Sequence, residues 1–424
     1  MALPETYPTE RPLDSCEKGV PGSVESLRLE DVAAQNWNLL NEDLPLPAAV
    51  IKLSAMKGNS AWMRAFVALA GVSFAPHGKT TMAPALFARQ IAAGAWGITL
   101  ATAQQCLVAK QHGVQRVLMA NQLVGKRNCA VISGMLRDPA FSFFCLVDSA
   151  AGVEYLGRFF SASGQCIDVL IELGIPGGRG GVRDDAQLDQ VVAAIRHWPT
   201  AVRLAGVEVY EGILNEESSI RSYLRRSVAV AQRLAAEGMI RRTPAILSGA
   251  GSAWYDVVAE EFAAAELGME VEVVLRPGCY LTHDVGIYQS AQARIMERNN
   301  VARSQGPSLE PALQVWAYVQ SRPEADLAII GLGKRDAAFD AGLPTPKRFH
   351  RPGRPGPVPV PVGWSLVRMM DQHAFLRLPV GDDLAVGDMI AFDISHPCLT
   401  CDRWRHLLVV DERNQVVEVI PTFF

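Results

Sequence analysis

The sequence predicts a (β/α)8 TIM barrel, an α/β fold, followed by a separate β domain. From about residue 45 to 285, short apolar runs rich in β-branched residues alternate with Ala-rich segments of helical period. There are eight barrel runs, whereas a doubly wound sheet usually has fewer strands. After residue 285, helical periodicity fades and proline and glycine accumulate. We therefore expect an N-terminal arm (1–46), a barrel (47–285) and a β domain (286–424).

The expected barrel elements follow one another in the order that a parallel barrel requires. The predicted strands are 72–75, 96–100, 116–120, 143–147, 167–173, 203–209, 243–247 and 271–275. The predicted helices include 84–93, 104–112, 186–197, 218–237 and 252–267.

The C-terminal part reads as β structure. Residues 348–364 (RFHRPGRPGPVPVPVGW) hold too many prolines for a regular helix. The segments predicted as strands are 313–320, 373–378, 388–394 and 407–411. One further β-rich run, 48–53, exceeds the count of the barrel. We expect it to join the β domain.

Composition excludes several classes of protein. The 424 residues are 49% hydrophobic and 20% charged, with a net charge of −4. This composition argues against a disordered or fibrous protein. No basic patch for nucleic acid and no apolar run long enough to cross a membrane is present. The polar, proline-rich start MALPETYPTERPLD is not a secretory signal. We expect a cytoplasmic protein with reduced cysteines.

Lys79 stands at the expected C-terminal end of the first strand, where barrel enzymes place their active sites. Gly78-Lys79-Thr80 looks like the end of a phosphate-binding P-loop, but that motif needs glycine where Ser73 stands. The spacing therefore excludes a P-loop. A surface lysine is the alternative for a lone residue of this kind.

The ends of later strands carry candidate ligand-binding groups. Two glycine-rich turns, after the seventh and eighth strands, predict a phosphate site because their backbone N–H groups and a helix starting near residue 252 attract an anion. A reactive lysine together with a phosphate site suits pyridoxal 5'-phosphate. The residues expected to bind this cofactor are Lys79, His77, Arg179, Tyr210, Ser248, Gly249, Gly251, Ser252, Gly278, Cys279 and Tyr280.

A pair of metal-binding residue types lies near the C-terminus. His396 and Cys398 are two apart, so in an extended chain both side chains point to one side. Imidazole and thiolate suit zinc and leave positions open for a ligand. One alternative is half of a zinc ribbon formed with Cys401, although no second CxxC exists. Another is buried thiols beside a hydrogen-bonded histidine.

These motifs resemble the D-serine dehydratase and D-threonine aldolase family, whose fold is that of the alanine racemase group. The resemblance covers about 47–401. Its motifs here are Pro-His-Gly-Lys-Thr (76–80), Tyr-Glu-Gly (210–212), Arg-Pro-Gly-Cys-Tyr (276–280) and Ser-His-Pro-Cys (395–398), with Asn59, Thr400 and Trp404. Cys279 replaces the usual threonine. A further departure is that His373 is kept without the acidic pair that often precedes it.

The resemblance implies a lyase that dehydrates D-3-hydroxy amino acids such as D-serine or D-threonine to a 2-keto acid and ammonia. Lys79 would hold the cofactor and act as the base at Cα, and His396 and Cys398 would bind a divalent metal, zinc or manganese, that polarises the β-hydroxyl. A thiolate ligand favours dehydration over aldol cleavage to glycine and an aldehyde, which is the alternative. A racemase, a non-catalytic cofactor carrier and a structural metal module are weaker alternatives. The related folds imply a homodimer.

Overall fold

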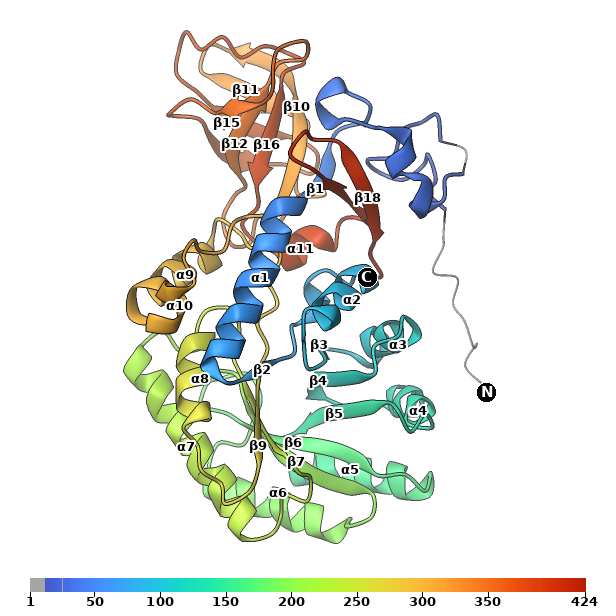
Figure 1. The fold of residues 1–424 in the computed structure, drawn as a ribbon, viewed down its shortest axis with the longest axis vertical. Coiled ribbons are helices and arrows are strands. Elements are labelled where there is room, and N and C mark those ends of the chain that lie inside the picture. Colours follow the sequence, from blue (N-terminus) through green and yellow to red (C-terminus); the bar gives the residue numbers. More distant parts are fainter. Residues whose placement is uncertain (1–11, 25) are drawn as a thin grey trace.

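The computed structural model describes residues 12–24 and 26–424. Residues 1–11 and 25 of the expected arm therefore lie outside the described residues. Two sheets organise this chain, one parallel with eight strands and one mainly antiparallel with ten. Figure 1 shows the helix-covered parallel sheet below and the β domain above it. The predicted fold class, a TIM-type barrel with a second β domain, is confirmed.

The parallel sheet has the strand order β2-β9-β8-β7-β6-β5-β4-β3. Its strands are β2 (Ser73–Phe74), β3 (Ile98–Leu100), β4 (Arg116–Gln122), β5 (Ser142–Val147), β6 (Ile167–Leu173), β7 (Val202–Val209), β8 (Ala245–Gly249) and β9 (Val271–Leu275). The first and last strands of that order meet through the Trp96 amide, which donates to Phe74 at 2.8 Å, and the Thr99 amide, which donates to Pro76 at 2.9 Å. These bonds close the barrel.

Helices surround the barrel because their apolar faces cover the outer faces of its strands. They are α1 (Leu53–Ala70), α2 (Pro84–Ala92), α3 (Ala103–Gln111), α4 (Lys126–Met135), α5 (Ala150–Ala162), α6 (Asp185–His197), α7 (Glu217–Ala236) and α8 (Tyr255–Ala263). One predicted boundary is wrong, since α8 begins at Tyr255 rather than near Ser252. Trp254, directly before α8, has φ −137° and ψ 20°, which lies outside the helical region, so the helix starts only after it.

Two apolar layers stabilise the barrel. Side chains two positions apart on a strand, such as Leu118 and Ala120 or Phe144 and Leu146, form a cluster made mostly of strand residues. The period of two places these residues on the inner face. The alternate strand residues pack with the helices in a second, larger cluster. Near-continuous apolar strands result, which is why the sequence predicted them well.

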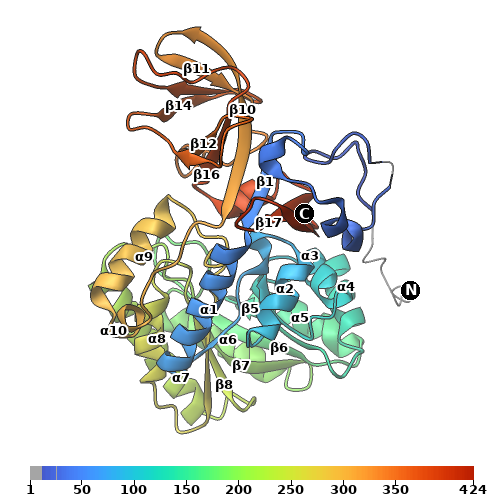
Figure 2. The ribbon, with the colours of Figure 1, turned by 45° about the horizontal axis from the view of Figure 1, so that its top comes forward.

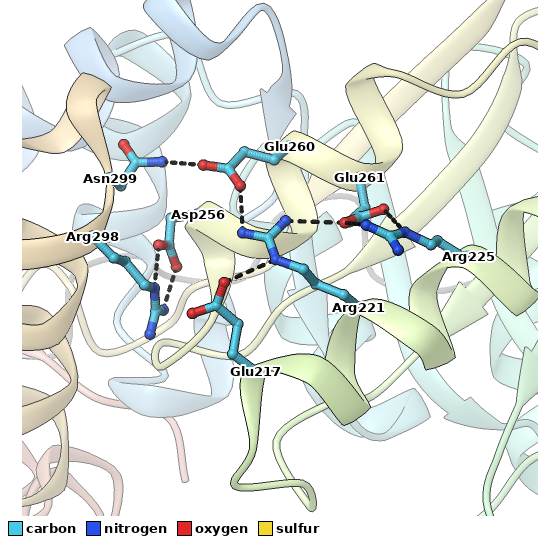
Figure 3. A network of polar contacts seen from close by, with 8 residues as sticks. All are labelled: Glu217, Arg221, Arg225, Asp256, Glu260, Glu261, Arg298 and Asn299. Atoms are coloured by element: carbon cyan, nitrogen blue, oxygen red, sulfur yellow. Dashed lines mark hydrogen bonds and ion pairs between the residues drawn. The ribbon is translucent and has the colours of Figure 1, made fainter.

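Ion pairs tie the later helices together on the barrel surface. Arg221 on α7 donates to Glu217 at 2.8 Å, to Glu260 at 2.7 Å and to Glu261 at 3.0 Å. Arg298 donates twice to the buried Asp256, both at 2.7 Å. Figure 3 shows how this network joins α7, α8 and α9 (Ile287–Arg298). The bidentate pair at Asp256 is the strongest kind of ion pair for fixing a helix.

The β domain follows α9 and the short α10 (Asn300–Ser304). Its strands are β10 (Leu313–Glu324), β11 (Leu327–Ile330), β12 (Thr345–His350), β13 (Val358–Pro359), β14 (Ser365–Met369), β15 (Ala374–Arg377), β16 (Met389–Asp393), β17 (His406–Val410) and β18 (Val416–Pro421). Between β16 and β17 lies α11 (Pro397–Cys401). The sequence predicted four of these strands, β10, β15, β16 and β17, and missed β11, β12, β13, β14 and β18.

The early strand β1 (Ala48–Lys52) belongs to the β domain sheet, as expected for residues 48–53. It pairs antiparallel with β10 and parallel with β17. Residues 12–46 hold three short 3-10 helices, η1 (Leu29–Asp31), η2 (Ala33–Gln35) and η3 (Leu39–Asn41). Their apolar side chains pack with β1 and β17. Figure 2 shows this arm beside the β domain.

Within residues 12–24 and 26–424, no helix has both the length and the apolar character needed to span a membrane.

Candidate active site

A cavity of about 450 Å³ lies at the carboxyl end of the barrel strands, beneath the β domain. Most of the predicted site residues line it: Lys79, His77, Arg179, Tyr210, Gly251, Ser252, Gly278, Cys279, His396 and Cys398. Residues that were not predicted also line it, among them Thr80, Arg276 and Tyr288. Because the barrel and the β domain both contribute, the cavity exists only where the two meet.

A second cavity, of about 520 Å³, lies between α1, α2 and β18. Its walls combine apolar side chains with Lys57, Arg64 and Arg89. Arg89 is paired with Glu418. Among the described residues, no histidine and no cysteine lines this cavity, so its lysine has no imidazole or thiol nearby in the cavity wall. We therefore take the smaller cavity, which gathers the reactive groups, as the active-site candidate.

Lys79 lies in the short 3-10 helix η4 (Gly78–Thr80), directly after β2. A Cβ atom on Gly78 would lie 2.7 Å from Ile98 Cγ2 and 2.8 Å from Phe87 Cε1. Glycine is therefore needed for η4 to pack against these side chains. Among the described residues, Lys79 Nζ has no hydrogen bond or ion pair, so its amine is free to react with a ligand.

His77 directly precedes η4 and is half-buried beside Lys79. Burial, followed by the charges of Lys79 and Arg276, holds the pKa of His77 well below its usual range. The ring is therefore neutral at pH 7. Its Nδ1 atom is buried without a hydrogen-bond partner among the described residues. A ligand in the cavity can supply that partner.

Arg276 follows β9 and forms a buried ion pair with Glu208 on β7. It also donates to the carbonyl oxygen of Val209 at 2.8 Å. Burial raises the pKa of Glu208 above its usual range, although Arg276 opposes this shift. Arg276 Nε is buried and unpartnered within the described chain. Arg276 belongs to the motif after strand eight, but nothing in that motif predicts that its side chain lines the cavity.

Arg179 and Tyr210 form one wall of the cavity. The Arg179 guanidinium lies 4.9 Å from the centroid of the Tyr210 ring and 3.6 Å from Glu172 Oε1. Gly212 allows the Tyr210 ring to fold back, because a Cβ atom there would lie 2.7 Å from the Tyr210 hydroxyl. Burial raises the pKa of Tyr210, so the phenol keeps its proton at neutral pH.

The two loops predicted to bind phosphate lie side by side. The Cys279 amide donates to Ser252 Oγ at 3.2 Å, which joins the loop after β9 to the loop after β8. The amides of Ala250 and Gly251 donate to the buried Glu211 carboxylate at 3.0 and 2.9 Å. These two amides therefore hold the loop in shape, and an anion in the cavity would use other donors, including Ser252.

Three predicted binding residues do not line the cavity. Ser248 is fully buried and its hydroxyl donates to the Val274 carbonyl at 2.9 Å. A Cβ atom on Gly249 would contact Val209 and Val258, so this glycine faces the packed core. Tyr280 packs edge-on against Phe74. These residues support the loops from behind.

His396 and Cys398 reach the cavity from the β domain. The expected extended geometry holds only for His396, because Cys398 already lies in the first turn of α11. His396 Nδ1 is 2.8 Å from Asp340 Oδ2. Hydrogen bonds with Cys398 and then Asp340 raise the pKa of His396 to about 9. Cys401 is buried in the apolar core, which argues against half of a zinc ribbon.

Cys398 of the β domain contacts two residues of the barrel. Its Sγ atom is 3.8 Å from Cys279 Sγ and 3.5 Å from Thr80 Oγ1. Its hydrogen bonds with Cys279 and His396 hold the pKa of Cys398 well below its usual range. In the described residues, no three His, Cys, Asp or Glu side chains are gathered closely enough to hold a metal ion as they stand.

Comparison with known proteins defines the class. The model of the alanine racemase N-terminal domain matches residues 51–281, and that of a putative serine dehydratase domain matches residues 312–410. The chain therefore belongs to the family of the alanine racemase N-terminal domain, with a serine dehydratase-type second domain. This result confirms the family resemblance noted in the sequence.

Individual relatives are lyases. The chain is 27% identical to a D-threonine aldolase from Arthrobacter sp. over 88% of its own length and 90% of the relative's. It is 32% identical to a D-threo-3-hydroxyaspartate dehydratase from Delftia sp. (strain HT23) over 40% of its own length and 44% of the relative's. The crystal structure of D-threonine aldolase from Filomicrobium marinum matches 91% of the chain and 97% of that structure, with a TM-score of 0.73 and 25% identity.

Proposed function

We propose that the protein is a pyridoxal phosphate- and metal-dependent lyase that removes water from D-3-hydroxy amino acids. The observation that carries this proposal is the shared cavity, where an unpaired lysine from the barrel faces a histidine and thiol pair from the β domain. The curated relatives support the lyase class, since one is an aldolase and the other a dehydratase. A cytoplasmic location stays a prediction from the sequence.

The residues of the cavity fit pyridoxal phosphate. Lys79 offers an unpaired amine for the aldehyde carbon, and the buried Nδ1 of His77 and Nε of Arg276 lack partners in the described chain. Ser252 offers a hydroxyl for the phosphate at the joined loops. The cofactor, when bound, supplies an electron sink that makes the substrate's Cα proton acidic. Lys79 would then accept that proton at Nζ.

The β domain residues fit a divalent metal as a ligand pair. Asp340 bonds to Nδ1 of His396, which leaves Nε2 for a metal, and this is the usual second partner of a metal-binding histidine. In solved structures of a D-threo-3-hydroxyaspartate dehydratase, a histidine and a cysteine two positions apart have each been replaced by alanine, and the structure of the cysteine variant is described as the metal-free form. His396 and Cys398 have the same spacing. The metal would supply a Lewis acid for the β-hydroxyl.

Dehydration and aldol cleavage would use the same side chains. The thiol of Cys398 favours dehydration by the family resemblance, and the Delftia relative is a dehydratase. Aldol cleavage has its own support, because the Arthrobacter aldolase matches most of the chain. The two reactions differ in which bond breaks, Cβ–O or Cα–Cβ, and so in their products.

Product analysis tests the proposal. The cofactor-loaded protein is incubated with D-serine, D-threonine and D-threo-3-hydroxyaspartate, and 2-keto acids, ammonia, glycine and aldehydes are quantified. We expect keto acid and ammonia in equal amounts, and we expect chelation to stop the reaction while the cofactor stays bound. Formation of glycine and an aldehyde instead would mean that the protein catalyses aldol cleavage rather than dehydration. Inversion of the substrates without either product would overturn the lyase assignment.

We also propose a homodimer that brings a second β domain close to the cavity. Large apolar side chains are exposed on the β domain, including Val362 and Val380. Phe424, which lines the cavity, is also half exposed. A second copy is a suitable cover for such surfaces. Light scattering after gel filtration should give twice the monomer mass, and a monomer that is fully active would contradict this proposal.

A further inference from the structure

Two thiols from different domains meet in the cavity. Cys279 is 4% exposed and belongs to the barrel loop after β9. Cys398 lies in the first turn of α11 in the β domain, and its Sγ atom lies 3.8 Å from Cys279 Sγ. Both residues line the cavity, whereas Cys401 is packed in the core. The pair therefore faces any ligand that enters.

The distance between the sulfur atoms decides what this pair is built for. A disulfide requires about 2.05 Å, so the two sulfurs would have to move about 1.7 Å closer. A tetrahedral zinc ion with Zn–S bonds of about 2.3 Å holds two sulfurs about 3.8 Å apart. The observed 3.8 Å already matches the second geometry. Two thiols in plain contact would lie at a similar distance, so a further observation is needed.

That observation is the orientation of His396. Asp340 bonds its Nδ1 atom at 2.8 Å, and the ring also bonds with the Cys398 thiol. The carboxylate therefore occupies one ring nitrogen, Nδ1, and leaves Nε2 available to a metal. A buried histidine that served packing alone would not need a carboxylate behind it, whereas metal-binding histidines usually have one.

We propose that Cys279 is the third protein ligand of the metal, so that Cys279, Cys398 and His396 form a Cys2His site. This inference rests on the proposed function and deepens it by naming the metal and its coordination. As they stand, the three side chains are not gathered closely enough to hold a metal ion, so binding would require them to move closer together. The fourth position stays open for the hydroxyl of the substrate, as in catalytic zinc sites.

The ligand set selects the metal. Two thiolates and an imidazole are soft ligands that suit zinc, whereas magnesium and manganese prefer oxygen ligands. Because Cys279 comes from the barrel and Cys398 from the β domain, the metal would also join the two domains. A site with Cys398 and His396 alone would accept the harder metals more readily.

The sulfur count of the bound metal tests the inference. The reduced, cofactor-loaded protein is stripped of metal, loaded with one equivalent of zinc and measured by X-ray absorption at the zinc edge. We expect two sulfur ligands. Cys279→Ser should give one sulfur and bind zinc at least about 10-fold more weakly, since even partners of metal ligands contribute that much. Cys16→Ser, at an exposed thiol, should keep both sulfurs.

The outcomes separate the two proposals. Zinc bound with a single sulfur in the unmodified protein overturns the role of Cys279 and leaves the His396–Cys398 pair intact. No zinc binding at all overturns the metal part of the proposed function. The decisive count is made on the unmodified protein, so it does not depend on whether Cys279→Ser folds. Manganese that binds more tightly than zinc also overturns the Cys2His site.

Discussion

Buried polar atoms without partners mark the ligand-facing residues of the cavity. Nδ1 of His77 and Nε of Arg276 lack hydrogen bonds among the described residues. An unpaired buried group costs about 1–3 kcal/mol, and a ligand that bonds to it recovers this free energy. The pattern of residues at the strand ends does not predict that either atom lacks a partner. Their role as ligand-binding atoms is inferred from the folded structure, in which His77 and Arg276 line the same cavity as Lys79.

Lys79 is the first residue to test. Borohydride reduction of the loaded protein should fix the cofactor on the peptide that contains Lys79, as seen by mass spectrometry. Lys79→Ala should abolish this attachment and lower the rate at least about 10²-fold, because the covalent link and the proton acceptor are lost together. Lys57→Ala, which alters a lysine of the other cavity, is the matched control. Attachment that persists in Lys79→Ala would contradict the assignment.

Secondary structure was predictable where elements are buried or long. The barrel strands were predicted within a few residues because parallel strands are continuous apolar runs. The start of α8 was missed because Trp254, directly before the helix, has a non-helical backbone that the local sequence does not indicate. The five-residue α11 is too short for a periodic signal. Asp340 lies in the loop between β11 and β12, so no motif predicted its contact with His396.

The packing of η4 gives a prediction about two glycines. Gly78→Ala should destabilise the protein by about 1–3 kcal/mol, because the new methyl group would overlap Ile98 and Phe87. Gly58→Ala should instead stabilise it by about 0.5–1 kcal/mol, since Gly58 lies inside α1 with open space around it. Urea unfolding of the cofactor-free protein measures both. Shifts in the same direction would refute this account of η4.

The whole molecule places one active-site candidate between two unlike domains. The barrel supplies Lys79 and the joined loops, and the β domain supplies His396 and Cys398. The sequence predicted both domains and both halves of the site. It could not predict that Cys279 and Cys398 approach to 3.8 Å, because that contact depends on how the domains dock.

Acid should destabilise the whole fold through His283. Burial lowers the pKa of His283 from 6.5 to about 4, so the folded state binds fewer protons than the unfolded state. Its contribution to stability is present above about pH 6.5 and is lost as the pH falls toward 4, by about 3 kcal/mol. The melting temperature should fall between pH 7 and pH 4.5, and it should fall less in His283→Gln than in the unmodified protein. His197→Gln, at an exposed position, should behave like the unmodified protein.

The place of β1 has a consequence for the order in which the chain assembles during synthesis. The ribosome makes residues 48–52 long before their partners on one side, residues 406–410. The barrel strands are complete long before that point, at residue 275. A nascent chain would therefore hold a finished cofactor half and an unpaired strand at the same time. The β-domain half of the candidate site is made after the barrel half, so a prematurely terminated chain could keep Lys79 but lack His396 and Cys398.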